Sequence, residues 1–185
     1  MNGIISKINR LPFRKVIWFL PIGWAFHEME EWNIVSWYRG HFVNPPEMAP
    51  LSVFTLLAYS TLVGFVWTFI ASLFRNSKVT AGVLLLFFIL AAFMNAIQHI
   101  SWTVMFCAYS PGVLSSFFLI IPSVIYITWR VLRERLLPKW YIIILYLLTV
   151  PRVIETIKCG NEVMPMFEKL YRFANWLARL LWGRV

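Results

Sequence analysis

Between Leu51 and Phe74 the chain reads LSVFTLLAYSTLVGFVWTFIASLF, an apolar run without a single charged side chain. As a helix this run is about 36 Å long, which exceeds the roughly 30 Å hydrocarbon core of a bilayer. The overall composition agrees, because 60% of the 185 residues are hydrophobic and ten are Trp. These features predict an integral membrane protein and exclude an ordinary soluble domain.

Four further apolar runs flank this segment and are separated from it by polar connections. They cover Phe13–Trp32, Thr80–Ala108, Val113–Trp129 and Trp140–Ile157. Each is long enough to cross, or nearly cross, the hydrocarbon core as a helix. We therefore expect an all-α fold, a polytopic membrane helical bundle of about five transmembrane helices in residues 1–160.

Beyond residue 160 the hydrophobic pattern changes, and apolar and charged side chains alternate at helical spacing. The apolar face comprises Phe167, Leu170, Ala174, Leu177 and Leu181. This pattern predicts a C-terminal amphipathic helix within residues 161–185, which lies on the membrane surface or packs against the bundle.

The formal net charge of +9 raises the question of a nucleic-acid partner, but the basic residues lie mostly between and beside the apolar runs. No nucleic-acid motif accompanies them, so the lipid bilayer is the expected partner. Four basic residues precede the first run, namely Lys7, Arg10, Arg14 and Lys15. Because Lys and Arg are enriched in cytoplasmic connections, this arm predicts a cytoplasmic N-terminus.

All eight acidic residues are Glu, and three of them stand in the segment His27-Glu28-Met29-Glu30-Glu31. Ionisable groups close to hydrocarbon are costly unless they pair, bind an ion or face water. Residues three and four apart share a helix face, so His27, Glu30 and Glu31 are expected to project together, with Glu28 pointing away as a boundary charge.

The run Thr80–Ala108 carries Asn95 and His99, which are also four residues apart. At 1.5 Å per residue, these two side chains reach about the same depth as His27, in the outer half of the bilayer. The two helices are therefore expected to form a polar pocket. Arg152 and Glu155 reach a similar depth, but their spacing favours an ion pair within one helix.

Two imidazoles with carboxylates suit a divalent metal such as zinc or iron with an open position for water. The expected ligands are His27, Glu30, Glu31 and His99. Glu30 and Glu31 are also the candidate catalytic carboxylates, and Asn95 is a candidate oxyanion donor. Without a metal, a glutamate would act as general base with a histidine partner. Alternatively, the glutamates form a solvated helix end and His99 ties helices together.

The motif His27–Glu31 resembles the signature of the HXXEE family, small bacterial and archaeal membrane proteins. The segment Asn95–His99 and the turn Tyr109-Ser110-Pro111-Gly112 are similar to that family's later histidine and Tyr-Ser-Pro-Gly turn. The resemblance covers roughly residues 16–157. It implies a multi-span protein of a prokaryotic plasma membrane and a suspected enzyme, without indicating a substrate.

These observations favour a membrane-embedded hydrolase that acts on a lipid or lipid-linked substrate in the outer half of the bilayer. A proton- or cation-coupled transporter is the main alternative, since buried carboxylates also carry ions. The absence of a polar path toward the cytoplasmic side of the run Thr80–Ala108 argues against transport. A structural membrane factor that docks a partner through its C-terminal helix is a third alternative.

Overall fold

The computed structural model describes residues 8–45 and 47–183, so Lys7 of the basic arm lies outside the described residues. The expected all-α fold is confirmed, since every regular element there is a helix. In chain order these are α2 (Phe13–Val16), α3 (Phe19–Glu30), η1 (Glu31–Asn33), α4 (Ile34–His41), α5 (Pro50–Leu73), α6 (Ser77–Phe87), η2 (Phe88–Phe93), α7 (Met94–Phe106), α8 (Val113–Ser115), η3 (Ser116–Ile120), α9 (Ile121–Arg133), α10 (Lys139–Leu147), α11 (Val150–Cys159) and α12 (Pro165–Trp182).

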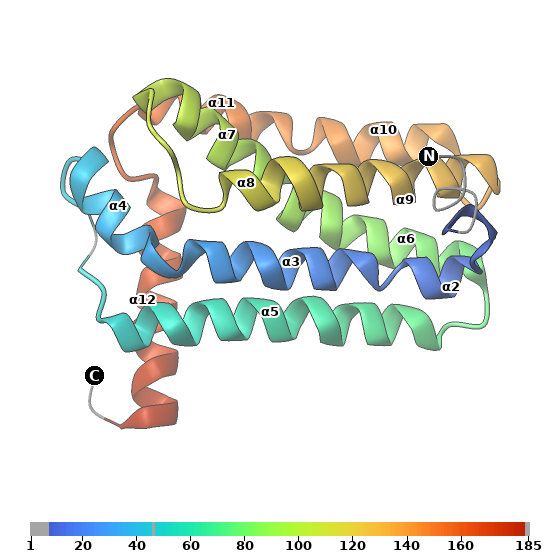
Figure 1. The fold of residues 1–185 in the computed structure, drawn as a ribbon, viewed down its shortest axis with the longest axis horizontal. Helices are drawn as coiled ribbons and strands as arrows, with labels where there is room; N and C mark the ends of the chain where they lie inside the picture. Colours follow the sequence, from blue (N-terminus) through green and yellow to red (C-terminus); the bar gives the residue numbers. More distant parts are fainter. Residues whose placement is uncertain (1–7, 46, 184–185) are drawn as a thin grey trace.

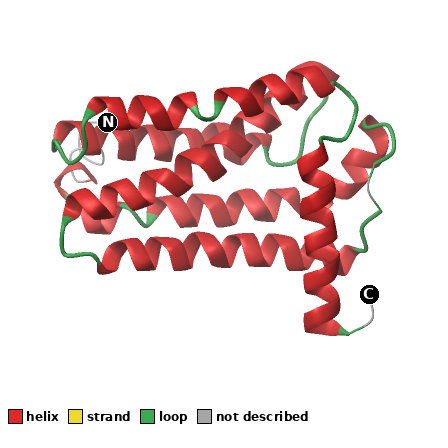
Figure 2. Ribbon diagram, turned by 180° about the vertical axis from the view of Figure 1, so that it is seen from behind, coloured by secondary structure: helices red, strands yellow, loops and turns green. Residues whose placement is uncertain are grey.

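Most of these helices run side by side along the long axis of the molecule, whereas α12 crosses them near one end (Figures 1 and 2). Within residues 8–45 and 47–183, three helices are long and apolar enough to cross a membrane: Pro50–Leu73, Ser77–Phe106 and Val113–Arg133. The segments α2–α3 and α10–α11 lie alongside them but are interrupted. A total of five spans therefore stays a prediction.

Proline residues explain both interruptions. A proline cannot donate a hydrogen bond to the carbonyl four residues earlier, and its ring clashes with that carbonyl. The carbonyl affected by Pro21 is that of Ile17, which lies between α2 and α3. The carbonyl affected by Pro151 is that of Leu147, the last residue of α10. Pro122 lies within a continuous helix, but the wider π-helical turn η3 precedes it and accommodates the missing hydrogen bond.

Two apolar clusters form the interior of the bundle. The larger one joins α3, α6, η2, α9 and α10 through side chains such as Leu20, Phe88 and Ile127. The smaller one is rich in aromatic rings and surrounds Trp102, which is 1% exposed. Tyr38 of α4 and Phe167 of α12 pack on Trp102, with ring centroids at 5.6 Å in each case.

Helix α12 packs against the bundle, as one of the two expected arrangements. Its buried face comprises Phe167, Tyr171, Ala174 and Ala178. The predicted face is therefore only partly right: Leu181 is exposed, and Tyr171 is buried instead. The reason is tertiary packing, because the Tyr171 ring contacts Tyr38 at a centroid distance of 6.0 Å.

Candidate metal centre

Two histidines and one glutamate from distant parts of the sequence meet inside the bundle. His27 comes from α3, Glu31 from η1 and His99 from α7. The Nε2 atoms of His27 and His99 lie 2.9 and 2.8 Å from the same oxygen, Oε1 of Glu31. One donor atom from each residue lies within 4.8 Å of the others, so this His-Glu-His group could hold a metal ion. Both imidazoles are fully buried.

Serine hydroxyls hold the opposite nitrogen of each imidazole. Nδ1 of His27 lies 2.9 Å from Oγ of Ser115, and Nδ1 of His99 lies 3.1 Å from Oγ of Ser110. These contacts orient both rings with Nε2 toward Glu31. Outer hydrogen bonds of this kind fix the tautomer and orientation of imidazoles that bind metals.

The proton on His27 can lie on either ring nitrogen. Nδ1 lies 2.9 Å from Oγ of Ser115, which donates to the Gly112 carbonyl at 3.1 Å, and 3.5 Å from Oγ of Ser116, a second hydroxyl. If Nδ1 carries the proton, Nε2 presents a lone pair to Oε1 of Glu31, and two acceptors face each other at 2.9 Å. The Asn95 amide donates to both, at 3.0 and 3.2 Å. A cation at this point would satisfy both acceptors.

Glu30 is adjacent to this group in sequence but has other partners. Its carboxylate accepts hydrogen bonds from the Tyr109 hydroxyl at 2.5 Å, the Leu114 N–H at 3.1 Å and the Ser115 N–H at 2.7 Å. Burial and the hydrogen bond to Glu30 raise the pKa of Tyr109 to about 12, so this hydroxyl remains a donor near neutral pH. Glu30 thus caps the N-terminus of α8 and fixes Ser115 behind the first imidazole.

Gly112 brings the backbone directly against both imidazoles. Its φ is +94°, a conformation that favours glycine, and a Cβ there would stand 2.9 Å from Cε1 of His27. The same Cβ would lie 3.1 Å from Cε1 and Nδ1 of His99. The turn Tyr109–Gly112 therefore closes the site, and its glycine leaves room for the two rings.

A model of a family described as proteins of unknown function with an HXXEE motif matches residues 18–127. This match covers more than half of the chain and contains His27–Glu31, His99 and the turn Tyr109–Gly112. The chain belongs to the HXXEE family. No curated protein and no solved structure matches it.

The residues of the HXXEE motif divide into two structural groups. The first and last, His27 and Glu31, face His99 and the Asn95 amide, as expected for a pocket between two helices. Glu30 faces the turn after α7 instead, so the structure does not bring it into the His-Glu-His group.

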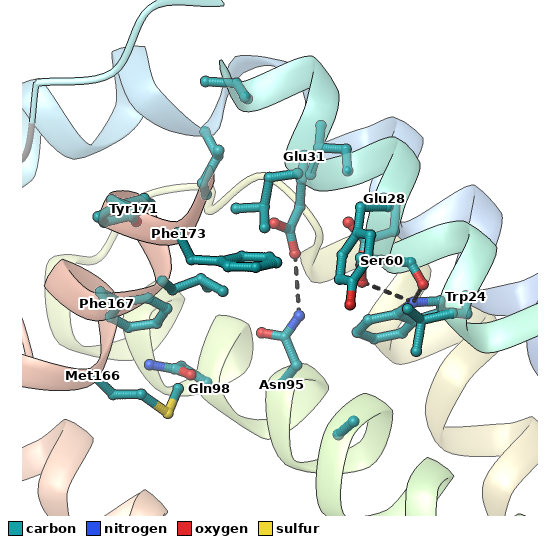
Figure 3. A pocket seen from close by; sticks show the side chains of 18 of the residues that line it. Trp24, Glu28, Glu31, Ser60, Asn95, Gln98, Met166, Phe167, Tyr171 and Phe173 are labelled. Atoms are coloured by element: carbon teal, nitrogen blue, oxygen red, sulfur yellow. Dashed lines mark hydrogen bonds between the residues drawn. The ribbon is translucent and has the colours of Figure 1, made fainter. Parts of the chain in front are cut away.

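A partly open cavity of about 360 Å³ lies beside the group, lined mainly by residues of α3, α5, α7 and α12. Figure 3 shows Glu31 and Asn95 on its wall with a hydrogen bond between them, and His99 also lines it. Apart from a few polar groups, the wall is formed by aliphatic and aromatic side chains. The metal-capable group thus borders a space with apolar walls.

Glu28 was expected to be a boundary charge, and this prediction is wrong. Its side chain is 5% exposed and accepts a hydrogen bond of 2.8 Å from the Ser60 hydroxyl on α5. The expected ion pair between Arg152 and Glu155 is confirmed at 2.5 Å.

Sequence reasoning missed the roles of Ser110 and Ser115. Ser110 stands in a recognisable turn, but Ser115 carries no local signal, because its role depends on how α8 packs against α3.

Proposed function

We propose that the protein is a membrane-embedded hydrolase in which His27, Glu31 and His99 bind one divalent metal ion, zinc or iron. The observation that carries this proposal is the convergence of two oriented Nε2 atoms on one carboxylate oxygen at the wall of an apolar cavity. A mixed nitrogen and oxygen donor set of three residues matches catalytic sites that keep an open position.

The donor geometry is compatible with a metal after a small adjustment. Around a tetrahedral ion with bonds of about 2.0 Å, neighbouring ligand atoms lie roughly 3.3 Å apart. The contacts to Oε1 of Glu31 are 2.9 and 2.8 Å, so the carboxylate would move outward by a few tenths of an ångström. Glu31 is the ligand that can move, because it lies in the short turn η1, just after the end of helix α3.

A bound divalent ion would supply Lewis acidity toward a carbonyl or phosphoryl oxygen and would acidify water. The chain's own residues would do the rest. Asn95 donates to His27 and Glu31 in the structure, and the amide hydrogen released when Nε2 of His27 binds the ion would be donated to the oxyanion that develops during attack by water. Glu30 would not touch the substrate but would position the turn that orients both imidazoles. In the overall reaction, water adds its hydroxyl to the acyl or phosphoryl group and its proton to the leaving group.

The cavity and the outer surface support a lipid-like substrate. The cavity wall is largely apolar and lies directly beside Glu31, Asn95 and His99. Outward-facing side chains of the candidate spans are large and apolar, for example Phe69 on α5 and Phe118 on η3. These features support an integral membrane protein. Its place in a prokaryotic plasma membrane, the cytoplasmic N-terminus and the site in the outer half of the bilayer are further parts of the proposal.

A metal-free version has one observation in its favour. The distances of 2.9 and 2.8 Å to Glu31 are ordinary charge-assisted hydrogen bonds, which a proton on Nε2 of each imidazole would explain. In that version Glu31 is a general base paired with histidine. The same network would also suit proton-coupled transport.

Metal analysis of the purified protein separates these versions. We expect about one zinc or iron per chain in the wild type, and loss of that metal in His27→Ala and His99→Ala. His41→Ala is the matched control, because His41 stacks on Trp37 at 4.5 Å, outside the group, and should leave the metal content unchanged. A metal-free wild type would exclude the metal-dependent hydrolase.

The hydrolase itself is tested by lipid analysis of cells that express the wild type or Glu31→Gln. A lipid species should accumulate in the variant, since its cleavage is lost. Identical lipid profiles together with a normal metal content would favour transport or a structural role.

A further inference from the structure

We propose that the cavity beside the metal centre binds amphiphiles that carry an ammonium group, and that Glu28 is the residue that recognises this group. The inference rests on the proposed function in one respect, because it names the substrate class of that same site.

The first observation is the electrostatic character of the cavity. The protein carries a formal net charge of +9, with 17 Lys and Arg residues. None of the Lys and Arg residues that the structure describes lines the cavity, whereas the carboxyl groups of Glu28 and Glu31 both do. The wall is therefore apolar, carries no described Lys or Arg side chain, and offers in Glu28 an acidic group that the metal centre does not use, which suits a cation with an apolar tail.

The second observation is that Glu28 is buried without a counter-charge. Its side chain is 5% exposed, and among the described residues no Lys, Arg or His forms an ion pair with it. Its carboxylate oxygen Oε1 accepts one hydrogen bond from the neutral Ser60 hydroxyl. A carboxyl group buried in this way either keeps a proton or pairs with a cation, and the cavity is the side from which a cation could come.

The third observation is a hydrogen-bond chain that holds Glu28 in place. Nε1 of Trp24 donates to Oγ of Ser60 at 3.2 Å, and Oγ of Ser60 donates to Oε1 of Glu28 at 2.8 Å. Gly64 allows Trp24 to lie against α5, since a Cβ there would approach Cδ1 of the indole to 3.0 Å. Oε2 of Glu28 receives no hydrogen bond from the described residues, so it is the oxygen free to meet a ligand.

Trp24 adds a second attraction for a cation. Its indole lines the cavity next to Glu28 and Ser60, as Figure 3 shows. One face of the indole stacks on the His27 ring at a centroid distance of 5.2 Å, so a cation would approach the other face. The remaining wall, with Leu57, Leu90 and Phe173 among its members, would hold the alkyl chain.

Calorimetric titration of the holoprotein in neutral-lipid nanodiscs tests this inference, with heats from empty nanodiscs subtracted. The probes are dodecylamine, dodecanol and dodecanoate, which share the chain and differ in the head group. We expect the wild type to bind dodecylamine about tenfold or more tightly than dodecanol, and dodecanoate most weakly. Equal affinity for the amine and the alcohol would overturn the inference.

Three variants locate the binding. Glu28→Gln should reduce the preference for amine over alcohol to within about twofold while dodecanol still binds. Glu162→Gln removes an exposed carboxylate that does not line the cavity and should keep the wild-type preference. Ala91→Phe fills the cavity and should abolish binding of both probes. A preference retained in Glu28→Gln, or binding retained in Ala91→Phe, would contradict the inference.

Metal content measured on the same samples separates this inference from the proposed function. Loss of the amine preference in a wild type that contains its metal would refute only the ammonium site. An intact amine preference in a metal-free wild type would refute only the metal centre.

Discussion

Gly112 and His27 stand so close that a single added methyl group would separate them: a Cβ at Gly112 would lie 2.9 Å from Cε1 of the imidazole. This contact joins the turn after α7 to the HXXEE motif on α3. It explains physically why the motif and the later Tyr-Ser-Pro-Gly turn form one structural unit, since the turn holds the rings whose other nitrogens converge on Glu31.

Gly112→Ala should disrupt the site more than backbone strain alone explains. A positive φ costs a non-glycine residue roughly 1–2 kcal/mol, and here the new methyl group also displaces both imidazoles. We expect a lower midpoint of thermal unfolding and loss of bound metal. Gly160→Ala is the control, because Gly160 also has a positive φ of +58° but no neighbour within 4 Å of its Cβ position. Equal metal content in the two variants would contradict this account.

Ser115→Ala and Ser110→Ala should weaken metal binding without removing a ligand. Each substitution deletes the hydrogen bond that holds Nδ1 of one imidazole. Loss of such an outer partner typically lowers metal affinity by about 10- to 100-fold. Competition with a chelator of known affinity measures the change. Ser36→Ala, at an exposed position on α4, should have no effect. Unchanged affinity in both site variants would show that the serines do not orient the rings.

Glu30→Gln should destabilise the protein while leaving the three proposed ligands in place. Hydrogen bonds to a charged acceptor contribute about 1.5–3 kcal/mol, and Glu30 accepts three of them from the turn and from α8. Thermal unfolding in detergent should show a lower midpoint than in Glu162→Gln. Direct coordination of the metal by Glu30 predicts a different result, namely that metal is lost while the unfolding midpoint of the metal-free protein is unchanged.

Reporter fusions at the C-terminus test whether the number of spans is odd or even. If α2–α3 and α10–α11 both cross, the chain has five spans, and a cytoplasmic N-terminus places the C-terminus outside. A C-terminal alkaline phosphatase fusion should then be active and a green fluorescent protein fusion dark. A bright fluorescent fusion would mean that just one of the two interrupted segments crosses, or that the N-terminus lies outside.

The fold class and half of the site were predictable because they depend on patterns within single segments. Uncharged runs such as Leu51–Phe74 predict helices directly, and a spacing of four places His27 and Glu31 on one face. The rise per residue then predicted that His99 and Asn95 lie at about the same depth in the bilayer as His27. Each of these inferences uses only the rise and period of a helix.

The remaining features depend on how helices rotate about their axes, which helical period alone does not determine. Glu28 follows His27 directly and was expected to point outward, yet it is buried because α5 covers that side of α3. Glu30 and Glu31 point in different directions for two reasons. The helix changes from α to 3-10 geometry at Glu31, and the backbone N–H of Ser115 in α8 donates a hydrogen bond to Glu30. Such choices are decided by neighbours that the local sequence does not reveal.

X-ray absorption at the metal edge of the purified protein tests the central claim most directly. The account predicts two imidazole nitrogens and one carboxylate oxygen at about 2.0–2.2 Å from a single ion in the wild type, and no such shell in His99→Ala, which loses the ion. A wild type that binds no ion after incubation with zinc or iron(II), or a coordination shell unchanged by His99→Ala, would contradict it.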